Sequence, residues 1–456
     1  MKRIIYIIAA TLLATSCAVK YQQPQVDVEH IIRDAEGADT TFDVSQVEWR
    51  EFYKDPHLAA LIDSALANNF DMKRAIARID QASAYFKQGK SAFFPSLNSN
   101  ASAGYTKPDL ASDQTPYFSL GATLSWEIDI WGKIRSAKRG KYETLLAQQS
   151  SKDAVQTRLI SDIAKAYYTL VVLDTEKRFI LETIRNREEY LSTVKSLKEA
   201  AQVTEVAVLQ AEAQLLLAKT YLPDIEHAIY QSENTISLLL GVPPMEIKRG
   251  EVKSLEDIHF PMATEVGVPA GLLRNRPDVL AAEHTLKSAM EGFNTAKAAM
   301  YPSLTLTGNV STDAAQISQW FAMPGSLLYG IFGGLTQPIF HSRALRTQKD
   351  VAWQEYQISA LNFQQTVLTA GAEVSNVLSS IKTDREKVTY MTKQTIALGK
   401  AYEYSVELLI NGYANYLDVL SAQEGYFNSQ INLIMGLQEC INNNIDLYRA
   451  LGGGWK

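Results

Sequence analysis

The chain has 456 residues, which is enough for two or three ordinary domains or for one elongated architecture. Its composition, 46% hydrophobic and 21% charged, is typical of an ordered protein and argues against a chain that is disordered throughout. The formal net charge is −6, and no run of lysines and arginines stands out. Because phosphate binding requires clustered positive charge, nucleic acid is not expected as a partner.

The N-terminus has the order of a secretory signal peptide. A basic start, an apolar stretch over residues 4–13 and a few small residues precede Cys17. The apolar stretch is too short to cross a membrane as a helix. A cysteine directly after small residues resembles the lipobox of bacterial lipoproteins, in which the thiol is acylated before cleavage, although Ala14 stands where leucine is commoner. We expect a signal peptide over residues 1–16 and a covalent lipid on Cys17; the alternative is an ordinary signal with an unrelated cysteine.

The remaining sequence has one further cysteine, Cys440. A disulfide within the mature chain is therefore not expected, and Cys440 is interpreted as a small buried apolar residue. No later stretch reaches the roughly 18 uninterrupted apolar residues that mark a spanning helix. If the exported protein crosses a membrane, it must use β-strands, whose sequence signal is weaker.

An internal repeat organises the chain. Three pairs of segments match in the same order: 66–72 with 273–279, 94–97 with 301–304, and 208–212 with 419–423. The first two pairs are separated by 207 residues and the third by 211. The difference of four residues between these two separations indicates an insertion in a loop. We expect a lipid-anchored segment over 17–57 and two repeats over 58–260 and 261–456.

Each repeat shows the same order of expected elements. A helix comes first, near Leu58 to Ala92 and near Leu272 to Met300, and a proline follows that cannot continue it. Two short alternating segments come next, and then a very long helical stretch. One such stretch, Ile134 to Ala200, would span about 100 Å at 1.5 Å per residue.

The alternating segments predict four β-strands, two in each repeat. Apolar and small polar residues alternate in 97–105, 118–127, 304–311 and, less regularly, 327–337. This pattern is typical of strands between lipid and water, but the face of a soluble β-sandwich looks the same locally. A length of about 10 residues and aromatic residues near several ends favour the membrane. The polar loops 107–116 and 312–325 would then lie outside the cell.

Coiled-coil periodicity marks the long helical stretches. Apolar residues step by three and four in series that begin at Val206, Val367 and Leu417. Such a 3.5-residue repeat predicts helices packed side by side in a left-handed supercoil. The alternative, a globular bundle of short helices, would need frequent turn signals, and these are largely absent.

Four strands cannot close a barrel, and an open sheet edge in lipid leaves backbone groups unpaired at several kcal/mol each. Two copies would give eight strands with a filled interior, whereas three give 12 strands and a lumen. We therefore expect a mainly α protein with a membrane β-barrel. Its long coiled-coil helices form a tunnel, and its four strands per chain close a 12-stranded barrel in a homotrimer.

Motifs spread over nearly the whole chain carry a resemblance to a known family. They are residues 49–82, 124–133, 238–244, 276–283, 301–304, 412–423 and 450–455. In this order they resemble the TolC/OprM-type outer-membrane efflux factor lipoproteins of Gram-negative bacteria. The resemblance implies a barrel in the outer membrane and a helical tunnel through the periplasm. It also implies a periplasmic adaptor protein and an inner-membrane pump as partners.

The resemblance also assigns site residues. Ala200 and Ala201 in the first repeat, and Asn411 and Gly412 in the second, lie where the long helices should reverse. In the family these helix tips dock the adaptor and gate the channel.

In related channels, the helix after the second tip narrows the pore with a leucine and, four residues later, an aspartate. Here Leu417 matches the leucine, but Ser421 occupies the aspartate position. Asp418 lies three residues earlier, so an acidic ring is either displaced to Asp418 or absent if that side chain points sideways. The family also has a glycine-rich turn near Phe340, where this chain reads His-Ser-Arg over 341–343.

Catalytic and metal-binding patterns are not found. The six histidines have no metal-ligand spacing, and no nucleophile elbow is present. We expect no enzyme activity and no cofactor other than the lipid on Cys17. The expected function is a passive exit duct for small molecules in a tripartite efflux system. The alternatives are a conduit for protein secretion and, in a different class, a structural tether of the envelope; the cargo stays open.

Overall fold

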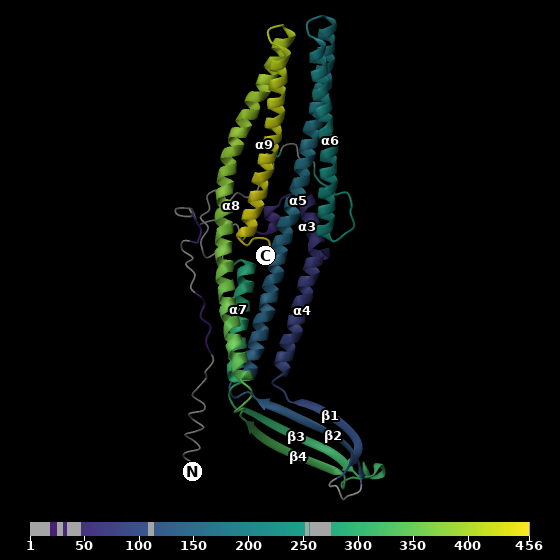
Figure 1. Cartoon of the computed structure of the whole chain (residues 1–456), viewed down its shortest axis with the longest axis vertical. Coiled ribbons are helices and arrows are strands. Elements are labelled where there is room, and N and C mark those ends of the chain that lie inside the picture. Colours follow the sequence, from purple (N-terminus) through teal and green to yellow (C-terminus); the bar gives the residue numbers. More distant parts are fainter. Residues whose placement is uncertain are drawn as a thin grey trace. The chain divides into compact units, whose positions relative to one another are not determined.

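The computed structural model describes residues 19–24, 31–33, 47–107, 114–250, 255 and 275–455. The predicted signal peptide, Cys17 and the boundary at residue 260 lie outside the described residues. The chain divides into two compact units, each of which combines segments of both predicted repeats. The first unit includes Ala77–Ser150 and Leu280–Gln365, and the second includes Ser151–Val279 and Thr366–Lys456. Figure 1 shows the elements of both units.

The first unit contains an antiparallel sheet in the order β1-β2-β3-β4. The strands are β1 (Ser96–Thr106), β2 (Thr115–Ile128), β3 (Ser303–Ala314) and β4 (Leu327–Thr336). All four predicted strands are confirmed. Among the described residues, β1 and β4 each pair with one neighbour only, so the sheet has two open edges.

The strand register locates the four-residue insertion between the repeats. Ser96 pairs with Ser125 in the first hairpin, and Ser303 pairs with Thr336 in the second. The two hairpins therefore correspond when β1 is advanced by 207 residues and β2 by 211. The connection from β3 to β4 is longer than that from β1 to β2, and it accounts for the difference between the two separations.

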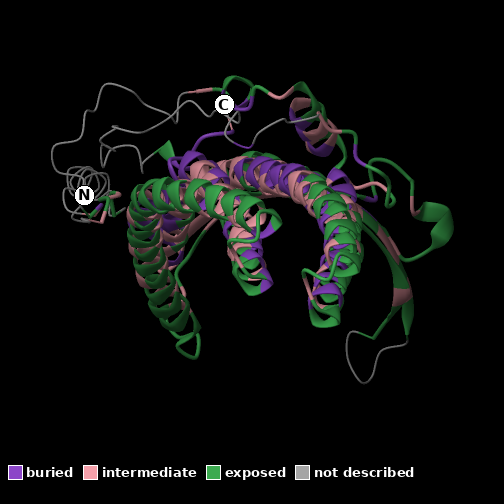
Figure 2. Cartoon of the chain, turned by 90° about the horizontal axis from the view of Figure 1, so that it is seen from above, coloured by how far each residue is buried: buried purple, intermediate pink, exposed green. Residues whose placement is uncertain are grey.

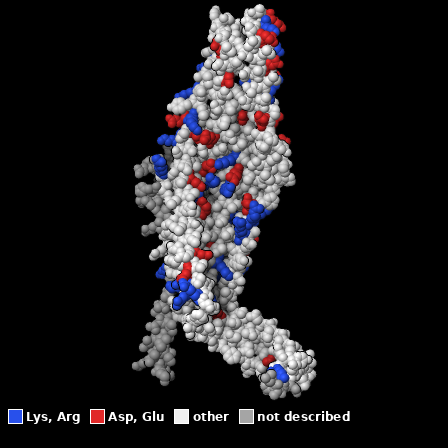
Figure 3. All heavy atoms as spheres, viewed as in Figure 1, with Lys and Arg blue, Asp and Glu red and all other residues white. Residues whose placement is uncertain are grey.

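The two faces of the sheet differ as the alternation predicted. Cross-strand pairing places Leu124 beside Leu97 on one side and Gly308 on the other, and it places Thr123 between Asn98 and Asn309. One face is thus apolar, and the other is mostly small and polar, with Tyr117, Leu328 and Phe332 as its large side chains. Within the strands only Glu127 and Asp313 are charged. Figure 3 shows the visible face of the strands nearly free of charge.

The first helix of each repeat is shorter than expected. The prediction of one helix over 58–92 is wrong, because α3 (Pro56–Asn68) ends and α4 (Phe70–Ser91) begins at Asn69. The buried Asn69 side chain accepts hydrogen bonds from the N–H groups of Asp71 and Met72 and donates one to the Leu239 carbonyl. It caps α4 and thereby breaks the helix. A short helix α2 (Trp49–Phe52) precedes them.

In the second repeat the first helix, α7 (Pro277–Ala298), begins at a proline, whose missing N–H costs nothing in the first turn. The expected residues 272–274 before it lie outside the described residues.

Four long helices follow the strands as two hairpins. They are α5 (Lys133–Glu199), α6 (Glu205–Leu240), α8 (Ala344–Ile410) and α9 (Tyr416–Ala450). Because α5 and α8 have 67 residues each, each measures about 100 Å along its axis. The alternative of a bundle of short helices is therefore wrong.

Within the described ranges, no helix has the combination of length and apolarity required to cross a membrane.

The predicted packing seams are only partly correct. In α8, Val367, Ala370 and Val374 are buried as expected. In α6 the expected series from Val206 is exposed, and the buried face consists of Val208, Ala211, Leu215 and Ala218. The helix carries two apolar stripes, and contacts within the chain use the one that the prediction passed over. Figure 2 shows buried residues where helices meet and exposed residues on their other faces.

The seam of α9 shows the same difference near its start. Leu417 is 60% exposed, and Tyr416 and Val419 are buried instead. From Phe427 onwards the seam follows the prediction, with Ile434 and Ile441 buried.

Candidate functional site

Figure 1 shows the turns that join α5 to α6 and α8 to α9. The two turns have the same backbone conformation. Ala201 has φ +58° and Gly412 has φ +76°, the left-handed conformation that ends many helices. The N–H groups of Ala201 and Gln202 bond to the carbonyls of Lys198 and Leu197, and the second hairpin repeats this pattern. The reversals at 200–201 and 411–412 are therefore where the sequence placed them. Their role in docking an adaptor stays a prediction.

The same conformation carries different residues in the two turns, which gives a paired prediction. An L-residue in this conformation costs about 1 kcal/mol relative to glycine. Ala201→Gly should stabilise the folded protein by about that amount, and Gly412→Ala should destabilise it by about the same. A Cβ at residue 412 would contact nothing within 4 Å, so its effect would come from the backbone alone. Thermal unfolding at one fixed protein concentration measures both; changes of the same sign would contradict the explanation.

A buried apolar cluster joins the two hairpins directly below their turns. It includes Val194 of α5, Val208 of α6, Leu409 of α8 and Val419 of α9. Tyr190 also belongs to it, with its ring stacked on that of Tyr416 at 6.2 Å between centroids. The cluster holds the two turns at one end of the second unit, so that a ligand bound there meets both hairpins.

The structure separates Asp418 from the other two constriction candidates. The Asp418 carboxylate accepts a hydrogen bond from the Asn415 N–H at 3.2 Å, and the Asn415 side chain accepts one from the Asp418 N–H at 3.1 Å. Asp418 thus completes a capping box at the start of α9. Leu417 and Ser421 are one turn apart, so they share an exposed stripe that continues to Glu424. The role of these residues in a pore stays a prediction.

Arg187 is a buried charge near this end that the sequence reasoning missed. Its guanidinium donates to the Gln214 carbonyl and lies 5.2 Å from the centre of the Phe427 ring. Burial lowers the pKa of the Arg187 guanidinium. The signal was available, because Arg187 occupies a core position in the 3-4 series of Ile180, Ile184, Leu191 and Val194. A charge in such a series fixes the register of helix packing at a cost in stability.

The junction between β4 and α8 contains a residue in the left-handed conformation, as the junction between β2 and α5 does. Arg343 has φ +62° and corresponds to Gly132, which has φ +80°, 211 residues earlier. At the first junction the Asp129 carboxylate accepts hydrogen bonds from the N–H groups of Ile134 and Arg135. The residue that corresponds to Asp129 at the second junction is Phe340, which cannot cap α8 with a carboxylate. The turn expected near Phe340 is therefore present, with arginine in a conformation that favours glycine.

Groups of histidine, cysteine and carboxylate side chains that could hold a metal ion are not found among the described residues. The candidate site consists of the two helix turns and the exposed stripe at the start of α9.

Comparison with known proteins identifies the family. The family model described as "Outer membrane efflux protein" matches residues 61–242 and 268–453. The chain is 26% identical over 460 residues to the cation efflux system protein CusC of Escherichia coli, covering 99% of this chain and 98% of CusC. It is 28% identical over 415 residues to the solvent efflux pump outer membrane protein SrpC of Pseudomonas putida, covering 89% of this chain and 87% of SrpC.

A solved structure shows the same fold. The open state of the MtrE outer membrane channel of Neisseria gonorrhoeae superimposes with a TM-score of 0.87 at 24% identity. The match covers 97% of this chain and 99% of that one.

Proposed function

The chain belongs to the outer membrane efflux protein family, and we propose that three copies of it form a passive duct through the outer membrane. The observation that carries this proposal is the four-stranded sheet with one apolar face, one small polar face and two open edges. An open edge in lipid costs several kcal/mol for each unpaired backbone group, so the edges must be joined. Three copies supply 12 strands, which is enough to leave a lumen between the polar faces.

The mass of the purified assembly tests the number of subunits. Protein extracted from outer membranes into a mild detergent should have the mass of three chains after correction for bound detergent. A mass of two or four chains would contradict the proposed closure.

We infer that the helical hairpins carry the duct through the periplasm and that their turns meet a periplasmic adaptor protein. The exposed apolar stripe of α6, which includes Val206, Leu209 and Leu216, supports contacts beyond the single chain.

An inner-membrane pump would supply the energy for export, because a passive duct has no energy source of its own. CusC and SrpC carry "cation" and "solvent" in their names, so the relatives do not share one cargo. We infer small solutes as the cargo class.

The tip of the duct is proposed to narrow at Leu417. Three copies of this exposed leucine around the axis would form an apolar constriction. Leu417→Ala should therefore raise the single-channel conductance, whereas Leu216→Ala, an equally exposed leucine farther along α6, should not. Equal changes in both variants would contradict a constriction at residue 417.

The acidic ring gives a second comparison at the same tip. If Asp418 faces the lumen, Asp418→Asn should lower cation selectivity or block by divalent cations, because three converging carboxylates attract cations. A silent Asp418→Asn together with a new cation block in Ser421→Asp would place the ring position at 421. The capping box survives in this variant, because the amide oxygen of an asparagine at residue 418 can still accept the hydrogen bond from the Asn415 N–H.

The lipid anchor on Cys17 is proposed from the sequence, and two contacts support its position. The Val19 N–H donates to the Asn294 side chain at 2.9 Å, and Asn294 donates back to the Val19 carbonyl at 3.1 Å. Asn294 lies near the end of α7 that leads into β3. Val19, two residues after Cys17 in the sequence, thus contacts the helix that leads into β3.

Cys17→Ser should abolish acylation and leave a larger precursor, as measured by labelling with a radioactive fatty acid. Retention in the outer membrane should fall without disappearing, because the strands have their own membrane affinity. Unchanged label in the variant would contradict the anchor.

A further inference from the structure

The two open edges of the sheet expose more apolar side chain than its inner strands do. On β4, Ile331 and Leu335 are 79% and 69% exposed, and Tyr105 on β1 is 74% exposed. On the inner strand β2, Leu120 and Leu124 are 40% and 37% exposed. The edge residues lack the neighbour that the inner residues have. If the proposed trimer forms, β4 of one copy must pair with β1 of the next.

The internal repeat fixes where that pairing must fall. The β2–β3 pairing within one chain joins the end of the first repeat's hairpin to the start of the second repeat's hairpin. The pairing between copies joins the second hairpin of one chain to the first hairpin of the next. In this pairing β4 takes the place that β2 has within the chain, and β1 takes the place of β3. Advancing each β2 residue by 211 gives its β4 counterpart, and moving each β3 residue back by 207 gives its β1 counterpart.

We propose that β4 pairs with β1 of the next copy in the antiparallel register that places Gly333 opposite Ala103. This inference rests on the proposed trimer and adds its register. The register follows from the pair Ala122–Val310 within the chain, because Gly333 is the counterpart of Ala122 and Ala103 is the counterpart of Val310. The same conversion gives Leu335 opposite Ala101, Gly334 opposite Ser102, Phe332 opposite Gly104, and Ile331 opposite Tyr105.

The faces of the sheet agree with this register. Leu335 and Gly333 share the apolar face with Leu304 and Leu306, their partners on β3. Ala101 and Ala103 share it with Leu120 and Phe118, their partners on β2. A slip of one residue would turn every side chain of one strand to the opposite face, so only slips of two residues compete.

Glycine positions disfavour those slips. A slip of two residues would place Gly104 opposite Gly330 in one direction and opposite Gly334 in the other. Pairs of glycines leave a sheet without cross-strand contacts. The proposed register places Phe332 over Gly104 instead. Within the chain Gly104 already pairs with Tyr117, whose ring covers it closely. The Phe332 ring lies over Gly330 of its own strand, on the face that Gly104 would share, so Gly104 would have an aromatic residue opposite it on each side.

Cysteine cross-linking in outer membranes tests the register. The background carries Cys440→Ala and keeps Cys17, whose thiol is proposed to be acylated. One variant carries Ala103→Cys with Gly333→Cys on the apolar face, and a second carries Ser102→Cys with Gly334→Cys on the polar face. A Cβ at Gly333 contacts nothing within 4 Å, and one at Gly334 meets only the Thr305 side chain at 3.5 Å, so both cysteines fit. Consecutive opposite pairs in an antiparallel ladder alternate between hydrogen-bonded and non-hydrogen-bonded, so the two variants test one pair of each type.

Two off-register variants are the matched controls: Gly333→Cys combined with Ala101→Cys or with Tyr105→Cys. Oxidation should yield covalent dimers and trimers from at least one in-register pair. The yield should exceed that of either control by at least about fivefold, because opposite Cβ atoms lie about 4.5–5.5 Å apart and diagonal ones about 7–8 Å.

Each other outcome overturns the register and shows whether the trimer survives. A higher yield from a control would move the register by two residues and leave the trimer intact. No cross-linking by any pair in an assembly with the mass of three chains would show that these edges do not meet. A mass of one chain would remove the proposed trimer as well.

Discussion

Replacing Leu120 with arginine is expected to destabilise the folded assembly by about 2–4 kcal/mol, the cost of a cation on the lipid face near the middle of a bilayer. Leu120 lies near the middle of β2 and pairs with Ala101 and Thr312. Its side chain shares the apolar face with Leu124 and Trp126. The fraction of protein that remains trimeric on heating in detergent would measure the effect, together with the amount that reaches the outer membrane.

Thr123→Arg is the matched control. It lies on the same strand, three residues away, but on the polar face between Asn98 and Asn309. An arginine there would lie in the aqueous lumen and should cost well under half as much. Equal losses at the two positions would show that the assigned faces are wrong.

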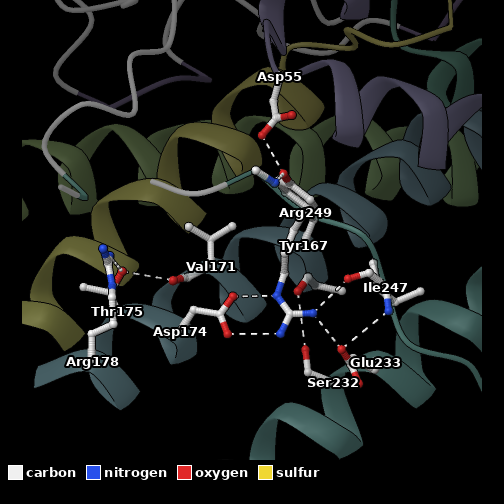
Figure 4. Close-up of polar contacts among 12 residues, drawn as sticks. Asp55, Tyr167, Val171, Asp174, Thr175, Arg178, Ser232, Glu233, Ile247 and Arg249 are labelled. Atoms are coloured by element: carbon white, nitrogen blue, oxygen red, sulfur yellow. Dashed lines mark hydrogen bonds and ion pairs between the residues drawn. The ribbon is translucent and has the colours of Figure 1, made fainter. Parts of the chain in front are cut away.

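Arg249→Met is expected to destabilise the second unit by about 3 kcal/mol. The Arg249 guanidinium bonds to both carboxylate oxygens of Asp174 on α5 and to Glu233 on α6 at 2.6 Å (Figure 4). The hydrogen bonds with Asp174 raise the pKa of Arg249 above its ordinary value. Loss of the guanidinium would leave the Glu233 carboxylate, whose side chain is 12% exposed, without its cation.

Arg74→Met provides the comparison for that network. Arg74 forms an ion pair with Asp71 on the surface of α4, where both side chains are about two-thirds exposed. Exposed pairs contribute at most about 1 kcal/mol, so this variant should unfold close to the wild type. Similar shifts in the thermal midpoint for the two arginine variants, at equal protein concentration, would contradict the role given to the Arg249 network.

Features with a repeated local signal could be predicted from the sequence. The alternation in the strands was visible because one face of the sheet is apolar and the other is small and polar. Small residues at 200–201 and 411–412 indicated the turns, since a left-handed residue is needed at each helix end. The offsets of 207 and 211 residues between matching segments also predicted which residues of the two hairpins correspond. The strand register places the four-residue insertion in the connection from β3 to β4.

Features that depend on which surface a neighbour covers could not be predicted in the same way. The stripe of α6 that includes Val206 has the same spacing as a buried seam, but the chain buries Val208 and Leu215 instead. Asn69 breaks a helix by capping α4, and its side-chain amide also donates to the carbonyl of Leu239, which is 170 residues away. The capping role of Asp418 needed the exact start of α9, a boundary that sequence periodicity leaves open by a few residues.

The conductance of the purified protein in a planar lipid bilayer tests the central claim most directly. A closed trimer with a polar lumen should produce long-lived current steps of uniform size without any added energy source. The steps should be enlarged by Leu417→Ala. Protein that is incorporated into the bilayer as a trimer, yet gives no discrete steps either as wild type or as the Leu417→Ala variant, would contradict the account of a duct.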